Sequence, residues 1–499
     1  MGQNKFHKLQ RPADLTFALC CLGAFLTETF LAYRQILLYS GKYQSDLSLH
    51  INIVRSGRGN YRMINFLVNM MDRITTNPWA IAVVMGLLVM STLIANYVLI
   101  RYFTRRFTES RISSEIMAVL ALYTGPIYIP KYMPYFYAKT QSKYAWQNPT
   151  QIMVTVFSVL ALWVFYKVYE RYMERITAWG WLLLAVAFLL SAWAKPSFIM
   201  EFFPAAAMVM LVDLFSKRRF CNASGMLPED ALVIGSADGQ GVPSKNSAGD
   251  FGLQTCPMTN SDTLDTANGQ GVPSKNIADD LCLETSPMTN SSSGDTCNRS
   301  AASEARSSNT GFTHRLRQVF ILGMTMLPAC IYFLMLNSTL FGSSAQEASN
   351  EAGKEVSKVV IQLGRAYFHQ DFSVTLSIIA GLAFPLFVLL FNLRELKKPE
   401  YAVGWLTVLW GYAIHFTFSE TGPRATHGNF AWGKKVAIYL IFAISMAKFL
   451  ENLYNPDFLQ GKKSRKVAYG IIGSLLLTLH LVSQLIYLVH VGHGGRYMI

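Results

Sequence analysis

Long apolar segments recur along this chain and constrain its fold more than any other feature. A helix needs about 20 apolar residues to cross the roughly 30 Å of hydrocarbon in a bilayer. Hydrophobic residues make up 52% of the 499-residue chain and charged residues only 15%, which is more apolar than a soluble globular protein. The sequence therefore predicts an all-α, polytopic transmembrane helix bundle with about eleven spans. We expect these at 14–38, 78–101, 113–130, 149–167, 178–194, 199–215, 318–336, 373–392, 402–418, 435–453 and 467–489.

Lysine and arginine residues gather in alternate connections between these segments. Short cytoplasmic loops are enriched in basic residues, and Lys5, Lys8 and Arg11 precede the first segment. We therefore expect a multi-pass protein of the cell membrane with a cytoplasmic amino terminus and a retained first span. Such orientation signals account for most of the +14 net charge without a nucleic-acid partner. The basic inner connections follow residues 101, 167, 215, 392 and 460.

Residues 217–317 form the one large polar interruption, rich in Ser, Asn, Gly, Asp and Thr. GQGVPSKN occurs at 239–246 and again at 269–276. Two copies are too few for a repeat domain that buries its own core, and the composition is typical of disorder. We interpret the segment as a disordered, low-complexity cytoplasmic insertion with a 30-residue tandem duplication, or as a docking segment for a partner. It separates the membrane parts 1–216 and 318–499.

The unusual polar and aromatic residues fall in the connections that this topology places on the outer face. Their concentration predicts a site there, whereas a transporter buries polar groups near the bilayer midplane. We expect no charged residue near the centre of a span. His415 and His480 lie inside spans, and we expect packed, hydrogen-bonded histidines there, with a proton carrier as the alternative. The outer connections include 41–51, 144–151, 194–198, 419–433 and 490–497.

The first outer loop, 39–77, has an internal organisation of its own. A short helix beginning at Ser45 or Asp46 would place Asp46 and His50 one turn apart on one face. Residues 61–73 show the spacing of an amphipathic helix, which would lie flat on the membrane and hold Asp46 near a lipid head group. Asp46 is then either a functional acid or only a helix cap. Three arginines of the loop suit a lipid phosphate or are solvated surface charges: Arg55, Arg58 and Arg62.

These residue types match what sugar transfer from a polyprenyl phosphate needs: a base, cations for the leaving phosphate and groups that hold the sugar. Asp46 is the candidate base, and His50 would orient it. Lys195, Arg424 and Arg58 are candidates for the donor phosphate. Lys195 is alternatively a snorkelling lysine, and Arg424 an ion-pair partner of Glu420. The candidates for the sugar or acceptor are Trp146, Asn148, His427, Asn429 and Trp432.

Four short motifs in these connections resemble the GT-C superfamily of polytopic membrane glycosyltransferases, and more narrowly a bacterial subgroup of it. They are SDLSLHI (45–51), WQNPT (146–150), AKPSF (194–198) and ETGPRATHGNFAWG (420–433). The resemblance covers both membrane parts and excludes the insertion. It implies that Asp46 matches the acid of the first outer loop, and that Lys195 and Arg424 fall where members hold cations for the donor phosphate.

Many GT-C members carry two acids close together in the first outer loop, and this loop offers Asp46 with Glu28 and Asp72 distant. We therefore expect an inverting, metal-independent transferase without a cofactor, acting on a lipid-linked sugar donor and a cell-surface glycan or lipid acceptor. Two other classes stay open. One is a polysaccharide polymerase or ligase using lipid-diphosphate donors, for which the outer loop 337–372, with Arg365 and His369, would matter. The other is a lipid-linked sugar flippase or transporter without catalysis.

Overall fold

A helix forms at each of the eleven apolar segments, so the all-helical bundle expected from the sequence is confirmed. The computed structural model describes residues 3–37, 46–57, 62–128, 148–215, 312–341, 359–363, 374–420, 429–459 and 463–492. Most of the expected insertion, 216–311, lies outside these ranges, and a helix is already present from Phe312. Within the described ranges, seven helices are long and apolar enough to cross a membrane, or eight if the bent pair Phe312–Met324 and Leu327–Leu336 is one span. That all eleven helices cross the membrane stays a prediction.

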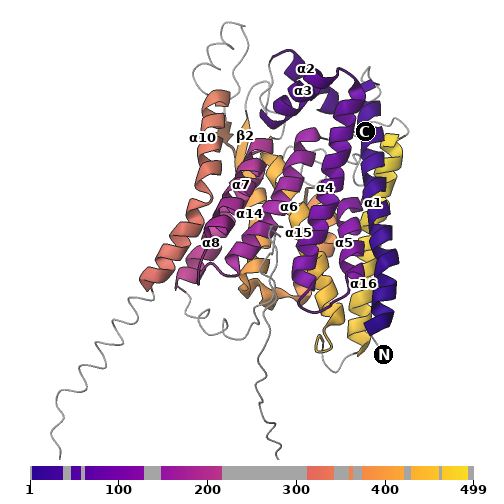
Figure 1. Cartoon of the computed structure of the whole chain (residues 1–499). Coiled ribbons are helices and arrows are strands. Elements are labelled where there is room, and N and C mark those ends of the chain that lie inside the picture. Colours follow the sequence, from indigo (N-terminus) through magenta and orange to yellow (C-terminus); the bar gives the residue numbers. More distant parts are fainter. Residues whose placement is uncertain are drawn as a thin grey trace, which may run out of the picture. The chain divides into compact units, whose positions relative to one another are not determined.

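The helices of the bundle lie side by side (Figure 1). Several begin where the sequence supplies a cap followed by proline, as at Asn77-Pro78 and Asn148-Pro149, which favours a helix start. The bounds are α1 Gln3–Leu37, α4 Pro78–Thr104, α5 Ile112–Tyr123, α6 Pro149–Tyr169, α7 Ala178–Ala194, α8 Ser197–Phe215, α10 Leu327–Phe341, α13 Val374–Phe391, α14 Pro399–Thr417, α15 Trp432–Tyr454 and α16 Lys463–Gly492.

One expected span is shorter than predicted. The segment 113–130 is helical only to Tyr123. The ring of Pro126 disfavours a helical conformation at Gly125, the residue before it. The extended chain that follows is held by other helices. The N–H of Gly125 donates to the carbonyl of His480 at 3.2 Å, and the His480 ring joins the Gly125 carbonyl to the Phe384 N–H. His480 is therefore a packed, hydrogen-bonded histidine, as expected.

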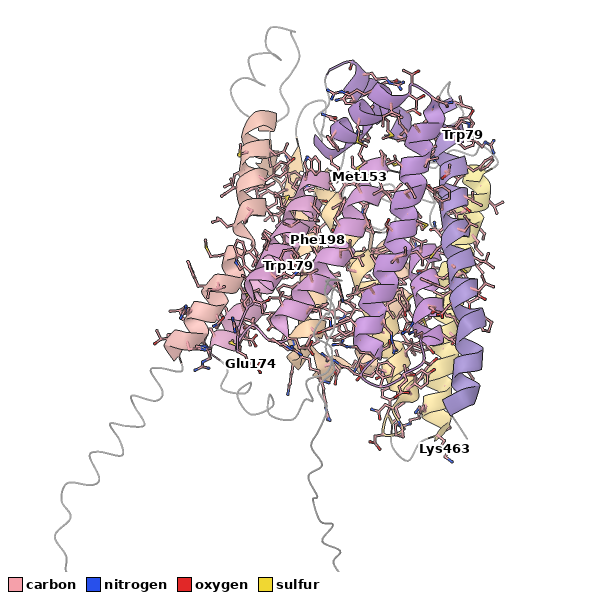
Figure 2. The ribbon with its side chains drawn as sticks, in the orientation of Figure 1. Trp79, Met153, Glu174, Trp179, Phe198 and Lys463 are labelled. Atoms are coloured by element: carbon pink, nitrogen blue, oxygen red, sulfur yellow. The ribbon has the colours of Figure 1, made fainter. Side chains whose placement is uncertain are left out.

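The two ends of the bundle differ in their residues. The amino terminus of α1, Glu174 and Lys463 lie at the lower end in the view of Figure 2, whereas Trp79 lies at the upper end. Both α1 and α16 begin at the lower end and finish at the upper end, which agrees with an odd number of crossings. The basic connections next to Glu174 and Lys463 thus share one end, as the charge alternation predicts.

The expectation that charged residues avoid the middle of the spans is wrong. Glu28 lies about one turn from the middle of the apolar segment Pro12–Leu37 and is 1% exposed. It lies on α1, which packs closely against α4; the carbonyl of Phe25 and the side chain of Thr29 come so near Gly86 of α4 that a Cβ there would overlap with them. Asn96 is also buried in a span, where its Nδ2 donates to the hydroxyl of Tyr439 at 2.6 Å.

Two short helices occupy the loop 39–77 at the upper end, as predicted: α2 Asp46–Arg55 and α3 Arg62–Ile74. Each buries an apolar stripe, with Ile51 on α2 and Val68 on α3 among the buried residues. The Arg55 guanidinium donates to both carboxylate oxygens of Asp72, at 2.8 and 3.0 Å. The structure therefore pairs Arg55 with Asp72. The sequence analysis expected this arginine to meet either a lipid phosphate or solvent.

The Arg55 hydrogen bonds lower the pKa of Asp72 below its usual value. An acid with a lowered pKa stabilises the fold fully above its unfolded pKa, and this contribution is lost as the pH falls through the lowered folded pKa. We expect acidification to loosen α2 against α3 by less than about 1 kcal/mol, because the pair is partly exposed. Amide exchange of both helices, corrected for its intrinsic pH dependence, measures this. Asp72→Asn should lack the pH-dependent step, and an unchanged step in that variant would contradict the assignment.

A two-stranded antiparallel ladder joins two connections at the upper end. Strand β1 (Val359–Ile361) precedes α13 and pairs with β2 (Phe418–Glu420), which follows α14. The Ser419 hydroxyl donates to Gln362 Oε1 at 2.9 Å beside the ladder. Two 3-10 turns complete the described elements, η2 Leu393–Lys397 and η4 Asn429–Ala431. The ladder ties the connection 337–372 to the polar connection that leads into α15.

Candidate functional site

The ends of four helices meet around the first turn of α15, and three of the predicted site residues lie there. Lys195 caps the carboxyl end of α7, Asn148 caps the amino end of α6, and Trp432 begins α15. The Lys195 Nζ lies 3.9 Å from the centroid of the Trp432 ring. It also donates to the Thr150 hydroxyl at 3.3 Å, which donates to Asn148 Oδ1 at 2.6 Å. The structure therefore brings Lys195, Asn148 and Trp432 together.

The AKPSF motif explains why Lys195 points inward. Lys195 precedes Pro196 and adopts an extended conformation, which ends α7 and lets α8 begin at Ser197. The sharp turn between the two helices carries the lysine into the bundle, where it is 5% exposed. Lys195 is therefore not a snorkelling residue with its ammonium group in water.

Two further lysines in the first turn of α15 complete a cationic group that the sequence analysis did not identify. Lys434 and Lys435 are 0% and 2% exposed. The Lys435 Nζ lies 3.9 Å from the centroid of the Trp432 ring, so both Lys435 and Lys195 contact this indole. The Lys434 Nζ lies 2.9 Å from His415 Nδ1. A signal was present in the sequence: adjacent lysines, at the span end that the charge alternation predicts to be outer, oppose the usual charge bias.

A buried glutamate from α8 faces the same turn. Glu201 is 1% exposed and accepts a hydrogen bond from the backbone N–H of Lys434. Its Oε2 has no hydrogen-bond partner among the described residues, so Oε1 is the acceptor. We define the α15 cluster as Lys195, Glu201, His415, Trp432, Lys434 and Lys435.

Glycines on two helices make room for the Glu201 carboxylate. A Cβ atom at Gly433 would overlap with Oε1 and would lie 2.5 Å from the carbonyl oxygen of Ser197. A Cβ atom at Gly411 would lie 3.0 Å from Oε2 and 2.8 Å from Lys434 Cα. The close approach of α8, α14 and α15 around this carboxylate therefore depends on the absence of side chains at both positions.

Burial of so many ionisable groups inside a membrane bundle is unfavourable unless they are paired or stacked. Here the Trp432 ring, the Thr150 hydroxyl and the first turn of α15 offset part of that penalty. A desolvated cation–π contact contributes about 2 kcal/mol. Charged groups retained at membrane depth usually mark a ligand or ion pathway. The ammonium groups of Lys195 and Lys435, both at the Trp432 ring, favour an anionic ligand.

The other predicted residues are described in part. Asp46 begins α2, and its side chain lies outside the described residues; His50 lies one turn later and is half-buried. The Phe66 ring of α3 lies 5.5 Å from the Trp193 ring near the end of α7, so this helix pair borders the connection that holds Lys195. Four predicted residues and one side chain fall outside the described ranges: Arg58, Trp146, Arg424 and His427, and the side chain of Asn429.

In the described part of the chain, no group of three or more His, Cys, Asp and Glu side chains is arranged to hold a metal ion. Comparison of the chain with models of known protein families finds no match, and comparison with curated protein sequences finds none either. What the site does therefore has to be argued from its chemistry.

Proposed function

We propose that this protein is a membrane glycosyltransferase that moves a sugar from a polyprenyl-phosphate-linked donor to a cell-surface glycan or lipid acceptor. The observation that carries the proposal is the burial of Lys195, Lys434 and Lys435 around the first turn of α15, inside a membrane bundle. A lipid-linked donor presents its phosphate at the membrane surface, where a bundle of this kind can reach it. The resemblance of the surrounding motifs to GT-C enzymes supports the same reading.

The leaving group of such a transfer is a lipid phosphate, which gains negative charge as its bond to the sugar breaks. Fixed cations that face this charge lower the barrier, and removal of one such group usually lowers the rate about 10²–10³-fold. Lys195 and Lys435 are held in place by the Trp432 ring. We therefore assign Trp432 to positioning the two ammonium groups, and leave stacking on the sugar to Trp146.

The remaining roles follow the expected chemistry. Asp46, oriented by His50, takes the proton of the acceptor hydroxyl as the acceptor oxygen bonds to the anomeric carbon with inversion. The bond from that carbon to the phosphate oxygen breaks, and the electron pair leaves with the lipid phosphate. Arg58 and Arg424 add charge at the phosphate, while His427 and Asn429 bind the sugar.

Asn148 fits a positioning role better than direct contact with the sugar. Its Oδ1 already accepts from the Thr150 hydroxyl and from the Gln151 N–H at 3.1 Å. Through Thr150 it orients the Lys195 ammonium group.

Two other functions retain specific support. The β1–β2 ladder joins the connection 337–372, with Arg365 and His369, to the connection leading into the α15 cluster, as a polymerase or ligase with a large outer loop would need. Buried Glu28 and Glu201 supply the ionisable groups within spans that a lipid-linked sugar flippase requires.

The direct test is sugar transfer in membranes that contain the protein. Asp46→Asn should abolish transfer from a polyprenyl-linked donor while the protein still inserts, because the amide cannot accept the proton. Asp72→Asn is the matched control, since it removes an acid from the same loop that pairs with Arg55, and it should retain transfer.

Normal transfer by Asp46→Asn would remove Asp46 as the base. Mass spectrometry of lipid-linked and surface glycans, with and without the protein, tests the reaction class. An unchanged glycan profile together with no transfer by the native protein would refute the glycosyltransferase assignment.

A further inference from the structure

We infer that the α15 cluster binds a sugar phosphate as one unit, with Glu201 as a hydroxyl ligand that distinguishes a glycosyl phosphate from a bare phosphate. The inference rests on the proposed function and extends it to residues that no motif assigned. Its starting point is the buried carboxyl group, which lies beside Lys434 yet retains an oxygen without a hydrogen-bond partner in the described structure.

The geometry of Glu201 points to a donor supplied by a ligand. The N–H of Lys434 fixes the carboxylate through Oε1, and the cradle formed by Gly411 and Gly433 fixes its position. Oε2 is buried without a partner in the described structure, which is costly for a polar oxygen. A hydroxyl group is the donor that satisfies such an oxygen without adding charge. Hydrogen bonds to charged groups are stronger than those between neutral groups.

Two further buried polar atoms belong to residues next to the α15 cluster and favour a ligand with several hydroxyl groups. Ser197 Oγ and Gln151 Oε1 are buried and have no hydrogen-bond partner in the described part of the chain. Ser197 belongs to the contact around Gly433, and Gln151 follows Thr150, which bonds Lys195. A lipid tail or an inorganic ion offers no group for these atoms, whereas a sugar does.

Lys195 and Lys435 would bind the phosphate group of the ligand. Lys195 and Lys435 each lie 3.9 Å from the centroid of one indole ring, so their Nζ atoms are no farther apart than twice that distance. A phosphate can contact either ammonium group or both. The Glu201 carboxylate repels any phosphate, but it also accepts a hydrogen bond from a sugar hydroxyl, which offsets that repulsion. The two halves together therefore select a phosphate that carries a sugar.

Binding to the purified full-length protein in detergent tests the inference without requiring turnover. The probes are glucose 1-phosphate, mannose 1-phosphate, inorganic phosphate and methyl glucoside, each titrated by calorimetry. The native protein should bind at least one hexose 1-phosphate more tightly than inorganic phosphate, and the neutral glucoside most weakly.

Glu201→Gln should weaken binding of the preferred hexose 1-phosphate and strengthen binding of inorganic phosphate. The ratio of the two affinities should fall about ten- to a hundred-fold, the equivalent of one charged hydrogen bond. Asp213→Asn is the matched control, because Asp213 is a buried acid of the same helix about 18 Å away, where it accepts from the hydroxyls of Tyr169 and Tyr172.

Lys435→Gln separates the charge half of the site from the hydroxyl half. It should weaken both phosphate probes to a similar degree and leave their ratio unchanged. Lys448→Gln is its control on the same helix, where Lys448 pairs with Glu395 and Glu451 at 3.1 and 3.0 Å. Melting temperature and gel-filtration profile report folding. Glu201→Asp, whose shorter side chain withdraws Oε2, replaces Glu201→Gln if that variant does not fold.

An unchanged affinity ratio in the Glu201 variants, or no binding of either hexose 1-phosphate by the native protein, would overturn the inference. These results are distinguishable from failure of the proposed function. Selective binding without transfer from a lipid-linked donor would refute the transferase and keep the sugar-phosphate site. Transfer that depends on Asp46 with an unchanged ratio would keep the transferase and refute the role of Glu201.

Discussion

Lys195→Met is expected to lower the rate of sugar transfer about 10²–10³-fold, the effect of removing one fixed charge from a developing anion. Methionine retains much of the length of lysine and its packing against the Trp432 ring, but it cannot stabilise the leaving phosphate. It also leaves the Thr150 hydroxyl without the donor at 3.3 Å. The rate is measured with a polyprenyl-linked donor in membranes that contain equal amounts of inserted protein.

Lys167→Met is the matched control for this substitution. Lys167 also lies over an aromatic ring, 5.5 Å from the centroid of Tyr102, but on α6 near the basic end of the bundle. We expect transfer close to that of the native protein. If both lysine variants lose activity equally, the loss reflects membrane insertion or stability, and the α15 cluster is not where the phosphate binds.

Gly433→Ala should produce the second large effect, a loss of stability together with activity. The added methyl group would overlap with the Glu201 carboxylate and with the carbonyl oxygen of Ser197, which belongs to the backbone and cannot rotate away. Overpacking of this kind costs about 1–3 kcal/mol, and more where rigid atoms collide. Relief requires α8 and α15 to separate, which would also displace Lys434 and Lys435.

Gly323→Ala is the control variant, because a Cβ atom added at Gly323 would have no neighbouring atom within 4 Å. That change should be neutral or slightly stabilising, because alanine favours a helix over glycine. Melting temperatures in detergent measure both variants. A Gly433→Ala protein that melts with the native protein and transfers sugar normally would show that the three-helix contact at Glu201 is not required.

The positions of the helices could be predicted from the sequence because a membrane imposes a length and a composition on each one. Hydropathy alone placed the end of the third segment too late, because the apolar run continues beyond Gly125-Pro126, the dipeptide that stops the helix. Glu28 was also misjudged. Its burial depends on how α1 packs against α4, and hydropathy contains no information about that contact.

Part of the site could be predicted because polar and aromatic residues are conspicuous at the ends of apolar segments. Lys195, Asn148 and Trp432 stood out as polar or aromatic residues at span ends, and the structure brings them together. Glu201 was missed because it lies about one turn after the start of α8, where an acid is ordinary. Lys434 was missed although the Lys434-Lys435 pair opposes the expected charge bias. Only the packing of α8 against α14 and α15 shows that they face each other.

The β1–β2 ladder has a consequence for the order in which the chain assembles. Val359 pairs with Glu420, and the chain between them contains all of α13 and α14. Closing so long a segment is entropically unfavourable until the intervening helices are already in place. The ladder can therefore form only after both helices have been inserted as a pair. The connection into α15 would then be fastened at a late stage of biogenesis.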